Sequence, residues 1–181
     1  MTASVGRSKQ CLPGKVTVAE YTRPATWRDL KTLVKYLDEA NVEYALVGGY
    51  AIAAHGFNRA SEDIDILVNP SLENARRWIL ALSRLPDHAT EELAADPDVF
   101  AKDSRYALRI NDEFTVDVMP SIAGHSWNKM QSYIETIDFE GMNLKLLNLE
   151  GLLMTKQGVR PKDQMDAAVL RRALSALGRL K

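Results

Sequence analysis

The chain has 181 residues, 46% of them hydrophobic, and a formal net charge of −1 at neutral pH. These values predict an ordinary globular chain with a sizeable core, and the weak charge excludes a global field that would attract nucleic acid. No stretch approaches the roughly 18 apolar residues of a spanning helix, so we expect no membrane partner.

Cysteine usage and the first residues predict a compartment. Cys11 is the sole cysteine, which excludes an intrachain disulfide and a thiolate metal cluster. Residues 1–15 lack the apolar centre of a secretory signal. We therefore expect a protein of the reducing cytoplasm.

A flexible segment, a helix and a strand are predicted first. Residues 1–24 are polar and aperiodic, with one candidate edge strand at 16–18. The motif that begins at Thr26 resembles a capping box, and the apolar residues behind it recur at helical spacing to about Asn41. The apolar run 44–47 is typical of a short buried strand.

Further elements alternate along the middle of the chain. Residues 50–55 suit a short helix that Gly56 can end in a left-handed conformation. Residues 63–68 alternate acidic and aliphatic side chains, as in a strand with one polar face, and 71–85 predict a serine-capped helix. The acid-rich segment 86–105 is left unassigned.

The second half predicts two hairpins and two helices. In chain order these are strands 106–110 and 113–119 around Asn111-Asp112, strands 134–139 and 142–147 around Glu140-Gly141, and helices 148–157 and 161–174. The sheet is thus mixed and the fold class is α+β. We expect one domain over 25–181, with a core at about 25–125 and a helical part at about 126–181.

Two carboxylates in the strand 63–68 are suited to metal binding. Asp63 and Asp65 alternate with isoleucines, so both acidic side chains point to one face, about 6.7 Å apart along the strand. Asp117 lies in a second apolar run and is the third candidate ligand. Mg²⁺, or Mn²⁺ in its place, requires such oxygen ligands when it assists in-line displacement at phosphorus.

A glycine pair gives weight to these carboxylates. An Asp-x-Asp alone is more often the solvated face of an edge strand, and a Gly-Gly alone is more often a plain turn. Gly48 and Gly49 stand between a predicted strand and a predicted helix, where the backbone can approach a phosphate closely. The combination favours chemistry on a nucleoside triphosphate, and the absence of Walker and G-x-G-x-x-G motifs excludes a P-loop or dinucleotide fold.

The series Gly48-Gly49, thirteen residues, Asp63-Ile64-Asp65 and then Val116-Asp117-Val118 resembles the polymerase-β-like nucleotidyltransferase superfamily over about residues 44–120. The resemblance implies a mixed sheet flanked by helices, with further helices toward the C-terminus. It also implies that two carboxylates bind the metal-triphosphate and that the third, Asp117, helps to deprotonate the attacking hydroxyl.

Two other segments look similar to small bacterial nucleotidyltransferases of the AbiEii-like toxin type. They are residues 59–65 and 156–166. In those proteins a C-terminal lysine helps to hold the nucleotide, and Lys156 is its match here. Arg59 could reach a phosphate, although a solvated arginine is as common. The weaker candidates are Arg160, Lys162 and Asp166.

Our leading hypothesis is a magnesium-dependent enzyme that moves a nucleoside monophosphate from a triphosphate such as ATP to an acceptor hydroxyl, releasing pyrophosphate. The acceptor stays open: the end of a tRNA, as in a toxin with a cognate antitoxin partner, a protein side chain, or an aminoglycoside or lincosamide antibiotic. The alternative from another class is a catalytically idle, antitoxin-like binding module, against which the intact carboxylates argue. A metal-dependent nuclease or a glycosyltransferase fits the motifs less well.

Overall fold

The computed structural model describes residues 15–17, 22–101 and 106–179. In this part of the chain seven strands form one sheet. In spatial order they are β1 (Lys15–Thr17), β4 (Leu108–Asn111), β5 (Thr115–Met119), β3 (Ile64–Val68), β2 (Tyr44–Val47), β9 (Met142–Leu147) and β8 (Ile134–Phe139). The expected edge strand at 16–18 is found one residue earlier, at the sheet edge.

The sheet is mixed, as predicted. Strands β2 and β3, β4 and β5, and β8 and β9 are antiparallel, whereas β1 and β4, β3 and β5, and β2 and β9 are parallel. Both expected hairpins are therefore confirmed. A small second sheet pairs β6 (Ser121–Ile122) with β7 (His125–Ser126).

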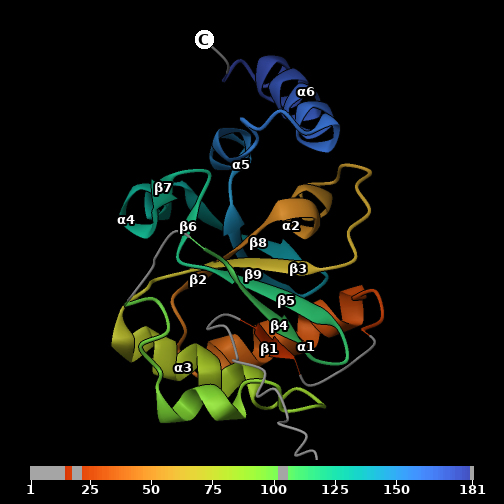
Figure 1. Cartoon of the computed structure of the whole chain (residues 1–181). Coiled ribbons are helices and arrows are strands. Elements are labelled where there is room, and N and C mark those ends of the chain that lie inside the picture. Colours follow the sequence, from red (N-terminus) through yellow and green to blue (C-terminus); the bar gives the residue numbers. More distant parts are fainter. Residues whose placement is uncertain (1–14, 18–21, 102–105, 180–181) are drawn as a thin grey trace, which may run out of the picture.

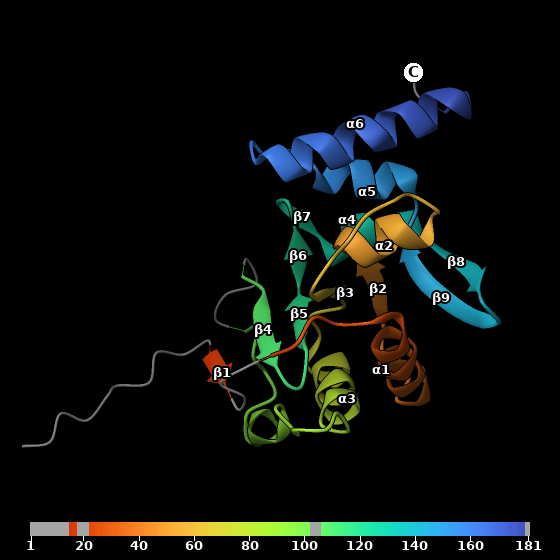
Figure 2. The same cartoon turned by 90° about the vertical axis from the view of Figure 1, so that its right-hand side faces the viewer.

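Helices cover both faces of the large sheet. They are α1 (Trp27–Glu39), α2 (Gly48–Ala54), α3 (Leu72–Leu82), α4 (Trp127–Met130), α5 (Leu149–Thr155) and α6 (Pro161–Ala176), with 3₁₀ turns η1 (Glu91–Ala95) and η2 (Gln131–Tyr133). Helices α1 and α3 lie side by side on one face, and α2 lies on the other, with α5 and α6 packed beyond it (Figures 1 and 2). The α+β architecture with helical flanks is confirmed.

Helix α1 illustrates how local sequence sets an element. The backbone N–H of Asp29 donates to the hydroxyl of Thr26, and the Asp29 carboxylate accepts from the Thr26 N–H, so the predicted capping box is present. Behind it a stripe of four side chains is buried in the core: Leu30, Leu33, Val34 and Leu37. Burying each contributes about 1.5–3 kcal/mol, which stabilises α1 far more than its cap does.

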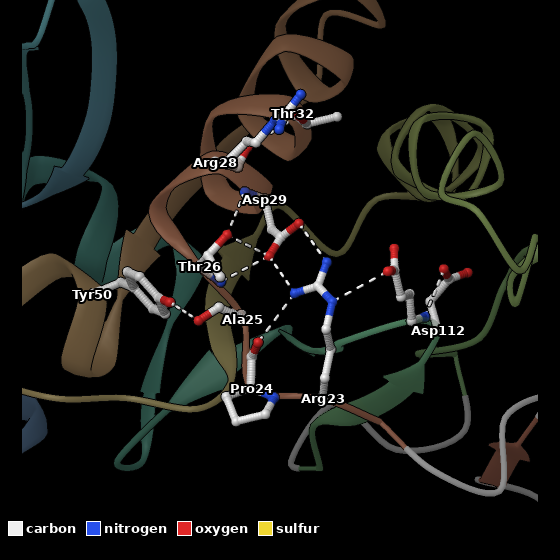
Figure 3. A network of polar contacts seen from close by, with 10 residues as sticks. Arg23, Pro24, Ala25, Thr26, Arg28, Asp29, Thr32, Tyr50 and Asp112 are labelled. Atoms are coloured by element: carbon white, nitrogen blue, oxygen red, sulfur yellow. Dashed lines mark hydrogen bonds and ion pairs between the residues drawn. The ribbon is translucent and has the colours of Figure 1, made fainter.

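The segment before α1 is tied to two other elements (Figure 3). The guanidinium of Arg23 donates to both carboxylate oxygens of Asp29, at 2.7 and 2.9 Å, and its Nε donates to Glu113 at 3.2 Å. The hydroxyl of Tyr50 in α2 donates to the carbonyl of Ala25. This network holds the entry to α1 between the β4–β5 loop and α2.

Several boundaries differ from the predicted ones. Helix α2 begins at Gly48 rather than Tyr50, so the glycine pair forms its first turn. Helices α3 and α5 end at Leu82 and Thr155, earlier than expected. The unassigned segment 86–105 contributes η1, and Phe100 from the same segment is buried against the core.

Two expectations from composition meet the structure only in part. Within the residues described, no helix combines the length and the apolar character needed to cross a bilayer. Cys11 and most of the expected N-terminal lead-in lie outside the described residues. The domain boundaries proposed from the sequence stay a prediction.

Candidate active site

The strand register places the candidate carboxylates in one row. Asp65 on β3 pairs with Asp117 on the parallel strand β5, and Asp117 pairs with Arg109 on the antiparallel strand β4. Paired residues on neighbouring strands point to the same face of a sheet, and Asp63, two positions before Asp65, shares that face. The structure thus brings the three predicted aspartates together.

Arg109 joins this row, and the sequence reading missed it. Its Nε and Nη2 donate to the two oxygens of Asp117, at 2.9 and 2.8 Å, and Nη2 also donates to Asp63 at 3.1 Å. The Asp117 side chain is 15% exposed, whereas that of Arg109 is 56% exposed. A single guanidinium therefore bridges two of the candidate metal ligands.

Asp65 is the most buried acid of the row in electrostatic terms. Burial, followed by the charges of Asp117 and Asp63, raises its pKa to about 7. Burial also raises the pKa of Asp63, an effect that the charge of Arg109 opposes. The hydrogen bond to Asp117 in turn raises the pKa of Arg109 above its ordinary value. The row is short of positive charge, which favours binding of a cation beside Asp65.

The glycine pair lies directly against these groups. Gly48 has a φ of +65°, and a Cβ built on it would lie 2.1 Å from Oδ2 of Asp65. A Cβ on Gly49 would lie 2.6 Å from the Cβ of Ser61. Glycine is therefore required at both positions, and no side chain caps the first turn of α2. The α2 backbone can approach a ligand at Asp65.

A buried ion-pair cluster adjoins the glycines. Nε and Nη2 of Arg59 donate to the Asp166 carboxylate at 2.7 and 3.2 Å, and the Lys156 ammonium lies 3.0 Å from the same carboxylate. Lys156 also reaches Asp163 at 3.3 Å. Burial alone would raise the pKa of Asp166, but the hydrogen bonds from its two cationic partners lower it.

This cluster connects the helical C-terminal part to the aspartates. Lys156 follows α5 and Asp166 lies in α6, whereas Arg59 precedes β3. The charge of Lys156 lowers the pKa of Asp65, and Nη1 of Arg59 would lie 3.5 Å from a Cβ on Gly49. Both predicted cations thus sit beside the glycine pair, held by an aspartate that the sequence reading ranked as a weaker candidate.

The donor set suits a hard divalent cation. The three candidate ligands offer only carboxylate oxygens, and like charges so placed need a positive partner. As the side chains stand, no three His, Cys, Asp or Glu residues in the described ranges form a group that could hold a metal ion. The oxygens of Asp63 and Asp117 are turned to the guanidinium of Arg109 instead. The residues fit such an ion chemically, after a rearrangement of side chains.

Comparisons place these features in a family. The model of the family described as aminoglycoside-2''-adenylyltransferase matches residues 29–170. This range contains the glycine pair, the three aspartates, Arg109 and the whole ion-pair cluster. No curated protein matches the chain significantly in sequence.

Solved structures share the fold. The lincosamide antibiotic adenylyltransferase LnuA, in its lincomycin-bound crystal structure, is 15% identical, with a TM-score of 0.55 over 81% of this chain and 97% of that one. A nucleotidyltransferase-like protein from Paracoccidioides brasiliensis is 20% identical, with a TM-score of 0.46 over 83% and 78% of the two chains. The antibiotic-resistance factor ANT(2'')-Ia is 16% identical, with a TM-score of 0.44 over 82% and 92%.

Proposed function

The chain belongs to the aminoglycoside-2''-adenylyltransferase family and is a nucleotidyltransferase, and we propose that it moves AMP from ATP to a hydroxyl group of a small, amino-sugar-containing acceptor. The observation that carries the proposal is the row of three aspartates whose central member, Asp65, touches Gly48. A triphosphate on the glycine backbone would bring its phosphorus atoms to these carboxylates.

The residues have distinct roles in the proposed transfer. The acceptor oxygen attacks the α-phosphorus and forms the new P–O bond, the bond to the β-phosphate oxygen breaks, and pyrophosphate leaves. Asp117 accepts the proton of the attacking hydroxyl, because it is the carboxylate farthest along the row from the glycine pair. Mg²⁺ or Mn²⁺ bound by the three aspartates would neutralise charge on the phosphates.

Arg59 and Lys156 serve the phosphates in this proposal. Both are nearly buried, with side chains 15% and 11% exposed, and both are fixed by Asp166 beside Gly49. Cations that are held in place stabilise a triphosphate without being reorganised at the moment of transfer. Gly48 and Gly49 supply the backbone that the phosphates approach.

The family match supports a small acceptor over tRNA. The formal net charge of −1 supports the same choice, because tRNA binding gains most of its affinity from basic surfaces. We keep tRNA, a cognate antitoxin and the idle binding module as outcomes of the test. Cytoplasmic residence also stays a proposal.

The test uses the purified chain with ATP labelled at the α-phosphate and Mg²⁺. Aminoglycosides, lincosamides and total tRNA are offered as acceptors in parallel, and labelled products are identified by mass spectrometry. We expect label on at least one aminoglycoside and none with the Asp63→Ala variant. Label on tRNA alone would contradict the proposed acceptor, and no product together with no thermal shift by Mg²⁺-ATP would favour the idle module.

A further inference from the structure

The guanidinium of Arg109 lies where the carboxylates of the site need a positive charge. We propose that Arg109 is a positioning residue that bridges Asp63 and Asp117 until the metal-bound triphosphate displaces it, so that a divalent ion without nucleotide binds weakly. The inference rests on the proposed function, since it concerns the same carboxylates. It adds a control over the order in which metal and nucleotide enter the site.

The bridging geometry is specific. Three hydrogen bonds of 2.8 to 3.1 Å run from one guanidinium to two carboxylates. The forked arginine head matches a carboxylate with two parallel donors, and this is how it meets Asp117. The register that pairs Arg109 with Asp117 across β4 and β5 fixes its backbone opposite the site. The side chain therefore holds both acids in one orientation.

The exposure of Arg109 makes it displaceable. Its side chain is 56% exposed, whereas the two other cations beside the site, Arg59 and Lys156, are 15% and 11% exposed and share the buried Asp166. A long exposed side chain can turn into solvent without opening the core. The triphosphate that arrives with the metal carries negative charge, so it can receive the released guanidinium.

Competition for the same oxygens has a measurable consequence. A free ion must break three hydrogen bonds and displace a positive charge, without any phosphate to accept that charge. Removing the guanidinium should therefore tighten binding of the metal alone and loosen the metal-free fold around the row. By linkage, metal should restore more stability to such a variant than to the wild type.

The experiment titrates Mn²⁺ into the full chain without nucleotide and measures free Mn²⁺ by electron paramagnetic resonance. We expect Arg109→Gln to bind Mn²⁺ at least about tenfold more tightly than the wild type. In thermal unfolding, Arg109→Gln should melt lower than wild type in EDTA and recover on addition of Mn²⁺. Equal affinities of the two proteins would overturn the inference.

The matched control is Lys162→Gln. Lys162 also acts on Asp63 through its charge, but it makes no hydrogen bond to the three aspartates among the described contacts. We expect its Mn²⁺ affinity to rise less than about threefold, and a gain equal to that of Arg109→Gln would show a general charge effect and overturn the bridging role. No substrate is present, so failure of transfer to aminoglycosides would refute the proposed function and leave this result standing.

Discussion

Gly48 and Asp65 are in such close contact that a single methyl group cannot be placed between them: a Cβ on Gly48 would lie 2.1 Å from Oδ2 of Asp65. The two residues lie on neighbouring elements, since β2 runs into α2 at Val47 and Val47 pairs with Asp65 in the sheet. The glycine turn and the carboxylate row are therefore parts of one site.

Gly48→Ala should displace Asp65 and lose transfer activity. The substitution forces the carboxylate to move, and a displacement of about 1 Å in such a site costs about 10²-fold in rate. It also places alanine at a φ of +65°, which costs about 1–2 kcal/mol of folding free energy. Steady-state kinetics and thermal unfolding measure the two effects.

Gly124→Ala is the control for backbone strain. Gly124 has a φ of +79°, but a Cβ there would meet no atom within 4 Å. We expect a similar loss of stability and an unchanged kcat/KM. Equal losses of activity in both variants would mean that the contact with Asp65 is irrelevant to the reaction.

Asp63→Ala should abolish transfer and leave the fold intact. Asp63 is 35% exposed and lies among like charges, so its removal relieves repulsion while it takes away a proposed metal ligand. We expect at least about a 10²-fold fall in kcat and an unfolding temperature close to that of the wild type. An active Asp63→Ala enzyme would refute the metal assignment.

Asp166→Asn should act on nucleotide affinity. The variant keeps the shape of the side chain but leaves Arg59 and Lys156 without their shared charge partner, and breaking a buried pair costs about 3–5 kcal/mol of stability. We expect KM for ATP to rise more than kcat falls. Asp163→Asn, which loses only a 3.3 Å contact to Lys156, should have a smaller effect on both. A larger effect at position 163 would contradict the central place of Asp166.

The Arg23–Asp29 pair should make stability depend on acidity. The hydrogen bonds from Arg23, and then those from Thr26, lower the pKa of Asp29 from 3.8 to about 2. Because the folded pKa is the lower one, the contribution of Asp29 is fully present above about pH 4 and is lost as the pH falls through about 2. Urea unfolding between pH 7 and pH 2 should show Asp29→Asn less stable at neutral pH, with the difference from wild type shrinking in acid. A constant difference would contradict this assignment.

The missed arginine shows where sequence reasoning stopped. A two-residue turn at Asn111-Asp112 would place Tyr106 opposite Asp117, whereas the actual loop of 112–114 places Arg109 there. Asp112 is no exposed turn residue: it is fully buried and accepts hydrogen bonds from the backbone N–H groups of Asp87 and Ala89. Those donors come from a segment that had no predicted structure. The loop length, and with it the register, depended on contacts far away in the sequence.

Local patterns alone determined much of this protein. The capping box, the strands that contain Asp65 and Asp117, and the side of each strand that carries its acid follow from neighbours within a few residues, because strand alternation and helix capping are short-range effects. Tertiary structure decided which strands pair, which cation faces the acids, and that Asp166 joins Arg59 to Lys156. Pairing register and ion-pair partners are set by packing between distant segments, and spacing along one chain does not encode them.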